Sequence, residues 1–243
     1  MEKQFDVGQN ISKESGAWSF SDGVASTFED HISKSVPSYY NAIETIVSLS
    51  DHFLPGGSSY YDIGCSTGTL SRSIFNEYKE RNIKITGLDI VPEMIDESKR
   101  QLDTINDPRA KEINYLCEDI LDFQLLDPSL ITSVYTLQFI QPAVRQIVIN
   151  KIYTSLNWGG ALFLFEKVRG PDARFQDILS NAYLKFKLKS FTPEQIVNKT
   201  LSLSSVLEPF STNGNIDLLK RAGFQDIMIV HKSLCFEGYL AIK

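Results

Sequence analysis

The sequence predicts an α/β fold: a seven-stranded, mostly parallel sheet with helices on both faces, a C-terminal antiparallel hairpin and an N-terminal helical cap. Short apolar runs alternate with helical stretches between residues 59 and 166, which is typical of a parallel sheet wound by right-handed crossovers. Two final apolar runs are separated by a short link, which favours a hairpin. The 243 residues are 42% hydrophobic and 22% charged, so the chain can bury a core of this size.

The helical cap is expected over residues 1–54. Residues 1–23 show no clear periodicity and are expected to form an irregular arm. From about Gly23 to Ser50, apolar residues recur at helical spacing in two runs. Pro37 lies between the runs and is expected to start the second helix. Pro55-Gly56-Gly57 then ends the helical pattern.

The central segment contains five strands, each a short apolar run. We expect them over Ser59–Ile63, Ile83–Leu88, Ile113–Cys117, Ile131–Tyr135 and Ala161–Phe165. The fifth run has no polar alternation, as expected for a strand covered on both faces. Helices are expected between these strands, from the first turn to Lys79, over Pro92–Leu102 and over Pro142–Leu156.

The C-terminal part of the chain changes character. A helical insertion is expected over 168–212, where apolar residues recur at helical spacing. The next helix, Asn215–Ala222, ends at Gly223, a residue typical of a helix C-cap. Strands over Asp226–His231 and Leu234–Ile242 form the hairpin. The whole chain, 1–243, is therefore expected to be a single domain.

Composition and charge exclude several classes of function. The net charge of −6 argues against a broad basic surface, so no stable direct binding to nucleic acid is expected. Lys185, Lys187 and Lys189 are interpreted as a solvated helix face, and a local basic patch is the alternative. Three cysteines and three histidines lack metal-ligand spacing, so no metal site is expected. Without a signal peptide or a membrane-spanning run, the protein is expected to be cytoplasmic and free of membranes.

The strongest local motif is the run Tyr61-Asp62-Ile63-Gly64-Cys65-Ser66-Thr67-Gly68, which follows a predicted strand and opens a predicted helix. Ser66 stands where a dinucleotide fingerprint has a glycine that lets the backbone approach a pyrophosphate. A ligand without phosphates, carrying an amino-acid tail and a nucleoside, fits this turn better. We expect Asp62 to accept hydrogen bonds from the ammonium group of that tail.

Two more aspartates end the next two strands. Asp89 is expected to accept both ribose hydroxyls, because a carboxylate at this position is a bidentate acceptor. Asp119 is expected to accept from an adenine amino group, and Ile120 offers the base an apolar surface. Each aspartate alone can be a helix cap or a turn residue. Three in order at the carboxyl edge of one sheet indicate a nucleoside site.

Over about residues 55–166, this order of motifs resembles the class I S-adenosylmethionine-dependent methyltransferases, which have a Rossmann-like fold. Nearly the whole chain is similar to the carboxy-S-adenosylmethionine synthase family, through the runs Trp18-Ser19-Phe20, Ser35-Val36-Pro37-Ser38-Tyr39, Tyr61-Asp62-Ile63-Gly64-Cys65-Ser66, Thr136-Leu137-Gln138-Phe139, Lys151-Ile152-Tyr153, Gly159-Gly160-Ala161-Leu162, Glu166-Lys167 and Ala222-Gly223-Phe224. The resemblance implies S-adenosyl-L-methionine or carboxy-S-adenosyl-L-methionine as cofactor. It also implies a homodimer and a part in wobble-uridine modification of tRNA.

The resemblance implies a set of cofactor-contacting residues: Tyr39, Gly64, Cys65, Ser66, Asp89, Ile90, Asp119 and Ile120. The other candidates are Asp62, Gly68, Met94, Val134 and Thr200. Val134 and Thr200 stand where the family has an asparagine and an arginine. That arginine is expected to hold the extra carboxylate of the product with its planar, charged fork. Lys199 or Lys189 could supply a point charge instead, although a solvated helical lysine is the alternative for both.

Three functions remain as hypotheses. The first is a methyltransferase-like transferase that moves the methyl group of S-adenosyl-L-methionine to an unidentified small-molecule acceptor. The sulfonium activates the methyl group, so the protein only aligns the reactants and excludes water, and no catalytic residue is assigned. The second is synthesis of carboxy-S-adenosyl-L-methionine from S-adenosyl-L-methionine and prephenate. The third is a cofactor-binding subunit without turnover.

Overall fold

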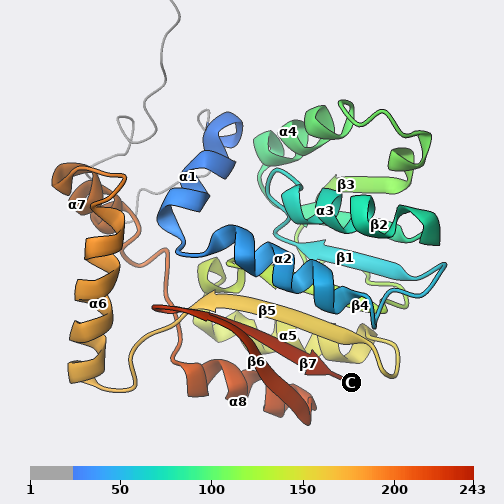
Figure 1. The fold of residues 1–243 in the computed structure, drawn as a ribbon. Coiled ribbons are helices and arrows are strands. Elements are labelled where there is room, and N and C mark those ends of the chain that lie inside the picture. The colour runs from blue at the N-terminus through green and yellow to red at the C-terminus, as the bar shows by residue number, and fades with distance from the viewer. Residues whose placement is uncertain (1–23) are drawn as a thin grey trace, which may run out of the picture.

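The computed structural model describes residues 24–243, so the predicted N-terminal arm and Trp18 lie outside the described residues (Figure 1). A sheet in the order β3-β2-β1-β4-β5-β7-β6 forms its centre. The strands are β1 (Ser59–Ile63), β2 (Lys84–Asp89), β3 (Ile113–Cys117), β4 (Leu130–Val134), β5 (Ala161–Lys167), β6 (Asp226–Ser233) and β7 (Phe236–Ile242). β1 to β5 pair in parallel, and β7 is antiparallel to both β5 and β6. The predicted mostly parallel sheet with a C-terminal hairpin is confirmed.

Helices cover both faces of this sheet (Figure 1). They are α1 (Phe28–Ser35), α2 (Tyr39–Ser50), α3 (Thr69–Tyr78), α4 (Pro92–Leu102), α5 (Pro142–Ser155), α6 (Ala173–Lys187), α7 (Pro193–Ser202) and α8 (Thr212–Ala222). One core contains Ile46 of α2, Ile74 of α3 and Ile95 of α4. The other core contains Ile149 of α5 and Leu218 of α8. None of the helices within 24–243 is long and apolar enough to cross a membrane.

β5 shows why a run without polar alternation forms a central strand. Successive side chains of a strand point to opposite faces of the sheet. Phe163 and Phe165 therefore enter the first core, while Leu162 and Leu164 enter the second. Both sets are fully buried, because helices lie over both faces.

Several element boundaries differ from the prediction by a few residues, and three of the differences have a clear local reason. β4 ends at Val134, because Tyr135 has a φ of +58° and leaves the strand. α2 begins at Tyr39 rather than at Pro37, because Ser38 has a φ of +59°. The predicted helical insertion contains two helices, since Thr192 starts α7 with a capping box.

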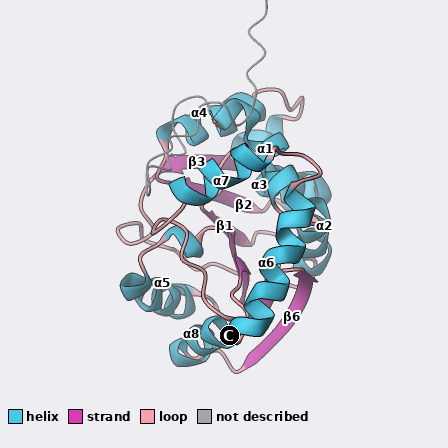
Figure 2. Cartoon of the chain, turned by 90° about the vertical axis from the view of Figure 1, so that its left-hand side faces the viewer, coloured by secondary structure: helices cyan, strands magenta, loops and turns pink. Residues whose placement is uncertain are grey.

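α1, α6 and α7 lie on the side of the molecule to which the carboxyl ends of the parallel strands point, and Figure 2 views it from this side. Hydrogen-bonded contacts join both α6 and α7 to α1. The Tyr183 hydroxyl of α6 donates to the carbonyl of Ser35 in α1 at 2.8 Å. Lys199 of α7 contacts the Nε2 atom of His31 in α1. The three helices therefore form one wall next to the strand ends.

Candidate functional site

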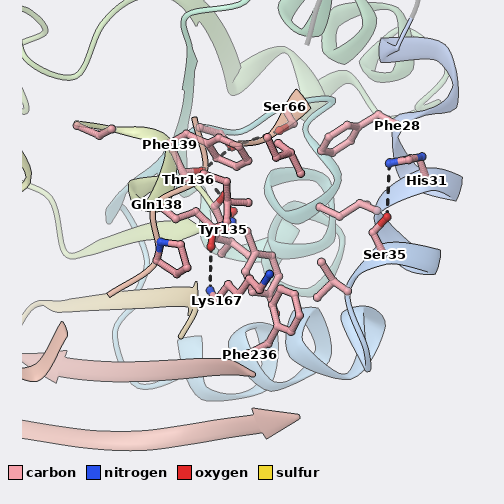
Figure 3. A pocket seen from close by; sticks show the side chains of 18 of the residues that line it. Phe28, His31, Ser35, Ser66, Tyr135, Thr136, Gln138, Phe139, Lys167 and Phe236 are labelled. Carbon is pink, nitrogen blue, oxygen red and sulfur yellow. Dashed lines mark hydrogen bonds between the residues drawn. The ribbon is translucent and has the colours of Figure 1, made fainter. Parts of the chain in front are cut away.

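A cavity of about 1180 Å³ opens at the carboxyl edge of the sheet. Its lining includes the ends of β1, β2, β4 and β5, the loop after β3, and residues of α1, α6 and α7; Figure 3 shows part of it. A pocket for one drug-sized ligand has a volume of roughly 300–1,000 Å³. This cavity therefore has room for a nucleoside cofactor and a second small molecule.

The turn after β1 fits closely into its surroundings. Gly64 has a φ of +70°, and a Cβ atom there would lie 2.2 Å from the Oγ1 atom of Thr136. Gly68 has a φ of +76°, and a Cβ atom there would lie 2.3 Å from the Tyr115 hydroxyl. Glycine suits both positions, because it has no Cβ atom to clash and adopts positive φ readily, whereas other residues rarely do. The turn thus presents bare backbone to the cavity at Gly64.

Asp62 lies at the end of β1 with only 2% of its surface exposed. The hydroxyls of Ser71 and Thr132 each donate to one of its carboxylate oxygens at 2.8 Å. Burial raises the pKa of Asp62 to about 6, and these two hydrogen bonds oppose the rise. The carboxylate is therefore held in one orientation at the cavity wall, where its predicted contact with an ammonium group remains a prediction.

Asp89 and Asp119 line the same cavity as Asp62, from the next two strand ends. The oxygens of Asp89 accept from the backbone N–H groups of Ser66 at 2.9 Å and Val91 at 3.0 Å. Burial raises the pKa of Asp89. Asp119 accepts from the N–H of Leu121 at 2.8 Å. Both aspartates thus also stabilise turns, the alternative role that the sequence left open.

The structure brings nearly all of the predicted contact residues to this cavity: Tyr39, Asp62, Gly64, Cys65, Ser66, Asp89, Ile90, Met94, Asp119, Ile120, Val134 and Thr200 line it. Gly68 does not line it and is instead the N-cap residue of α3. Ile90 is 68% exposed, whereas Met94 is buried. The Thr200 hydroxyl donates to the carbonyl of Ile196 in its own helix at 2.7 Å.

Three lysines line the cavity away from the aspartates: Lys167 of β5, Lys187 of α6 and Lys199 of α7. The Nζ atoms of Lys167 and Lys187 each lie 4.7 Å from the ring centroid of Tyr183. Within residues 24–243, neither of these two lysines forms an ion pair with a carboxylate, and the lysines that do are Lys34 and Lys232. We call Lys167, Lys187 and Lys199 the lysine cluster.

The surroundings of the lysine cluster disfavour the charged form of each ammonium group. Burial and the positive charge of Lys167 lower the pKa of Lys187 to about 8. Burial, Lys187 and Lys167 together lower the pKa of Lys199 to about 7. An anion bound among these ammonium groups would reverse both effects, because a nearby opposite charge favours the charged form.

Sequence reasoning named Lys199 as a source of positive charge but did not bring the three lysines together. Lys187 was interpreted with Lys185 and Lys189 as a solvated helix face, but Lys187 lines the cavity and the other two do not. A signal was present, because Lys187 follows Tyr183 by four residues and residues at this spacing share one face of a helix. Nothing in the sequence indicated that this face turns toward the strand ends.

The loop after β4 is held by buried polar groups. Glu166 accepts from the N–H of Leu137 at 3.0 Å, and burial raises the pKa of Glu166 to about 8. The side-chain oxygen of Gln138 accepts from the N–H of Lys167 at 2.9 Å. Arg145, 2% exposed, donates to the carbonyls of this loop. The loop that carries Tyr135 and Thr136 is thereby fixed to β5 and α5.

Comparisons with known proteins agree with this geometry. The family described as "Methyltransferase domain" matches residues 61–162. The chain is similar to the carboxy-S-adenosyl-L-methionine synthase of Staphylococcus epidermidis, with 36% identity over 228 residues that cover 93% of this chain and 97% of the relative. The synthase of Shigella boydii serotype 4 is 33% identical over 229 residues, which cover 94% of this chain and 92% of the relative.

Solved structures show a similar fold. Human N-acetylserotonin methyltransferase, in complex with SAM, aligns with a TM-score of 0.63 and 20% identity over 92% of this chain and 56% of its own. PigF with SAH aligns with a TM-score of 0.62 and 18% identity over 90% of this chain and 59% of its own. At these identities the likeness shows the methyltransferase fold alone.

Proposed function

Since the chain belongs to the family of carboxy-S-adenosyl-L-methionine synthases, we propose that it transfers a carboxyl group to S-adenosyl-L-methionine. It is an S-adenosylmethionine-dependent transferase of the methyltransferase fold, and S-adenosyl-L-methionine or its carboxylated derivative is its cofactor. The predicted enzyme class and cofactor are thereby confirmed. In the proposed reaction, S-adenosyl-L-methionine and prephenate give carboxy-S-adenosyl-L-methionine, phenylpyruvate and water.

One observation carries this proposal: Asp62 and Asp89, at the ends of β1 and β2, and Lys167, at the end of β5, line one cavity from opposite sides of β4. Asp62 and Asp89 suit the ammonium group and ribose hydroxyls of the cofactor, and Gly64 lines the cavity beside them. Prephenate carries two carboxylates, which suit the lysine cluster. A neutral methyl acceptor would bring no negative charge to Lys167 and Lys187.

The residues of the cavity bind and align the two reactants. Bound S-adenosyl-L-methionine supplies the methyl carbon that takes the carboxyl group. Lys167 and Lys187 hold prephenate by its carboxylates, and the partly buried setting strengthens this attraction. Tyr183 and Phe236 pack edge to face, with ring centroids 5.5 Å apart, and keep water from this end. No side chain is assigned as an acid or base.

Methyl transfer to an unidentified acceptor is the second candidate function. Val134 and Thr200 favour it, since neither can hold the carboxylate of a carboxylated cofactor as an arginine would. The Thr200 hydroxyl is bound to its own helix. Under the carboxyl-transfer proposal, Lys199 supplies the positive charge beside Thr200.

The predicted biological role, compartment and oligomeric state are part of the same proposal. We propose that the product serves wobble-uridine modification of tRNA and that the protein is a cytoplasmic homodimer of single-domain chains. The three cysteines are free, which suits a reducing compartment. The net charge of −6 supports the expectation that the chain itself holds no nucleic acid stably.

The test is turnover of S-adenosyl-L-methionine with prephenate, followed by mass spectrometry of the products. Carboxy-S-adenosyl-L-methionine together with phenylpyruvate supports the proposal. Lys187→Ala is expected to lower kcat/KM by about ten- to a hundredfold, because it removes a charged partner of the substrate. Lys185→Ala, on the same helix but outside the cavity, is the matched control.

The alternatives give different results in the same experiment. A methylated acceptor and S-adenosylhomocysteine would establish the second candidate. Tight cofactor binding without turnover of either kind would indicate a binding subunit. Full activity of the Lys187→Ala enzyme would contradict the assignment of the lysine cluster to prephenate.

A further inference from the structure

Tyr135 carries a buried hydroxyl that the fold does not use. The residue is 5% exposed, and its hydroxyl has no hydrogen-bond partner within residues 24–243. Buried polar groups normally have a partner, because an unpaired one is costly. Asn215 and His231 also carry a buried nitrogen without a described partner, but neither lines the cavity. Tyr135 does line it, beside Lys167 and Phe236 (Figure 3).

Packing alone does not require this hydroxyl. The Tyr135 ring contacts the rings of Phe165 and Phe236 edge to face, with centroids 6.4 Å and 5.6 Å away. A phenylalanine would keep both contacts without burying an unpaired oxygen. The backbone also has to adopt a φ of +58° here, which is rare for a bulky residue and typical of functional sites.

Tyr135 stands between the two ends of the cavity. On its C-terminal side, Thr136 reaches the turn that is predicted to hold the cofactor, where its Oγ1 atom lies 3.5 Å from the carbonyl oxygen of Gly64. On its other side, Phe236 contacts Tyr183, whose ring lies under Lys167 and Lys187. Because β4 lies between β1 and β5, Tyr135 directly after β4 lies between the strand end that carries Asp62 and the strand end that carries Lys167.

We propose that the Tyr135 hydroxyl donates a hydrogen bond to the carboxyl group that is transferred, and so distinguishes the carboxylated cofactor from S-adenosyl-L-methionine. This inference rests on the proposed function. The preceding residue, Val134, also lines the cavity but has no polar side-chain atom. Tyr135 supplies a donor one residue later. Burial raises the pKa of Tyr135, so the hydroxyl keeps its proton and acts as a donor.

The test compares Tyr135→Phe with the unchanged chain by titration calorimetry, using S-adenosyl-L-methionine and carboxy-S-adenosyl-L-methionine as separate ligands. We expect affinity for the carboxylated cofactor to fall about tenfold or more, and affinity for S-adenosyl-L-methionine to change less than about twofold. The melting temperature without ligand is expected to stay the same or rise, because the substitution removes an unpaired polar group.

Tyr78→Phe is the matched control. Tyr78 is buried outside the cavity, and its hydroxyl donates to the carbonyl of Val47 at 2.5 Å. This variant should lose stability and keep the relative affinity for the two ligands. A purely structural role of the Tyr135 hydroxyl would give that same pattern in Tyr135→Phe.

The possible failures are distinguishable. If the unchanged chain prefers carboxy-S-adenosyl-L-methionine and Tyr135→Phe keeps that preference, the inference is wrong and the proposed function stands. A second outcome is that the unchanged chain binds S-adenosyl-L-methionine but shows neither binding of the carboxylated cofactor nor turnover of prephenate. The inference about Tyr135 and the proposed function would then both be overturned.

Discussion

The protonation state of Lys199, which lines the cavity, changes with pH near neutrality. Its ammonium group contacts His31 and lies 3.2 Å from the Ser35 hydroxyl. Burial lowers the pKa of His31 to about 3, so this partner is neutral near pH 7. With its own pKa lowered to about 7, Lys199 is only partly protonated at neutral pH without a ligand. A bound carboxylate favours the protonated form.

Prephenate binding is therefore expected to take up protons. Above about pH 7 the free protein loses the proton of Lys199, and above about pH 8 that of Lys187, whereas the complex retains both. Affinity should fall as pH rises through this window, by up to about tenfold per pH unit for each lysine. Calorimetry at pH 8 in two buffers with different ionisation enthalpies measures the uptake directly. Affinity that is constant or increases from pH 7 to 9 would contradict the assignment.

Gly64 offers a separate test of the cofactor turn. Gly64→Ala places a Cβ atom 2.2 Å from the Thr136 side chain at a φ of +70°, so both a clash and a strained backbone follow. We expect a loss of about 2–4 kcal/mol in the free energy of unfolding, together with loss of S-adenosyl-L-methionine binding. Urea denaturation and calorimetry measure these two quantities.

Gly159→Ala is the control for backbone strain alone. Gly159 has a φ of +76°, but a Cβ atom there would meet nothing within 4 Å. This variant should lose only about 1–2 kcal/mol and bind the cofactor normally. Equal losses in the free energy of unfolding of both variants would show that the close approach of Gly64 to Thr136 does not affect stability.

At the scale of elements, Arg145 joins three segments of the chain. From α5 it donates to the carbonyls of Ile140 at 2.8 Å and Gln138 at 3.0 Å in the loop after β4, and to that of Glu208 at 2.7 Å before α8. Its guanidinium also lies 4.5 Å from the centroid of the Phe210 ring. Gln138, Ile140 and Glu208 all line the cavity. One buried side chain thus fixes one wall of the site.

Arg145→Met is expected to lower the free energy of unfolding by about 2–4 kcal/mol, because it leaves buried carbonyls without their charged donor. Lys151→Met is the control on the same helix, where an exposed lysine donates to the carbonyl of Leu121 at 2.7 Å. It should cost less than about 0.5 kcal/mol. Urea denaturation compares the two variants. Equal free energies of unfolding would mean that the hydrogen bonds of Arg145 do not contribute to stability.

The order and type of the elements could be predicted because apolar runs and helical periodicity are local properties. Their boundaries depended on single residues whose conformation is set by tertiary contacts. Tyr135 and Ser38 adopt positive φ, which cannot be predicted from their residue types. The division between α6 and α7 was visible as Thr192-Pro193 followed by Gln195, the pattern of a capping box. Apolar spacing alone did not indicate it.

At the scale of the whole molecule, the two halves of the site differed in how far the sequence could predict them. Each aspartate follows its own strand, and strand ends of a parallel sheet meet at one edge. The lysine cluster comes from β5, α6 and α7, and no local pattern determines how two helices outside the sheet will pack. Contacts across the fold place them, such as the hydrogen bond from Tyr183 to Ser35.

Hydrogen–deuterium exchange should distinguish the two ends of the cavity. Because the proposed prephenate site includes α6 and α7, its occupation is expected to slow amide exchange in those helices and in α1. α5 and α8 pack on one face of the sheet, so their exchange should change little. Equal protection of all helices, or protection confined to the loops after β1 and β2, would place prephenate elsewhere.

The separation of charge within one cavity makes the two ligands thermodynamically dependent on each other. A sulfonium cation at the aspartate end and a dianion at the lysine end attract one another across a partly desolvated space. Each should therefore raise the affinity for the other, and by the same factor, since such coupling is reciprocal. The protein would then hold each ligand more tightly when the other is bound, which favours the complex that contains both reactants over a complex with one.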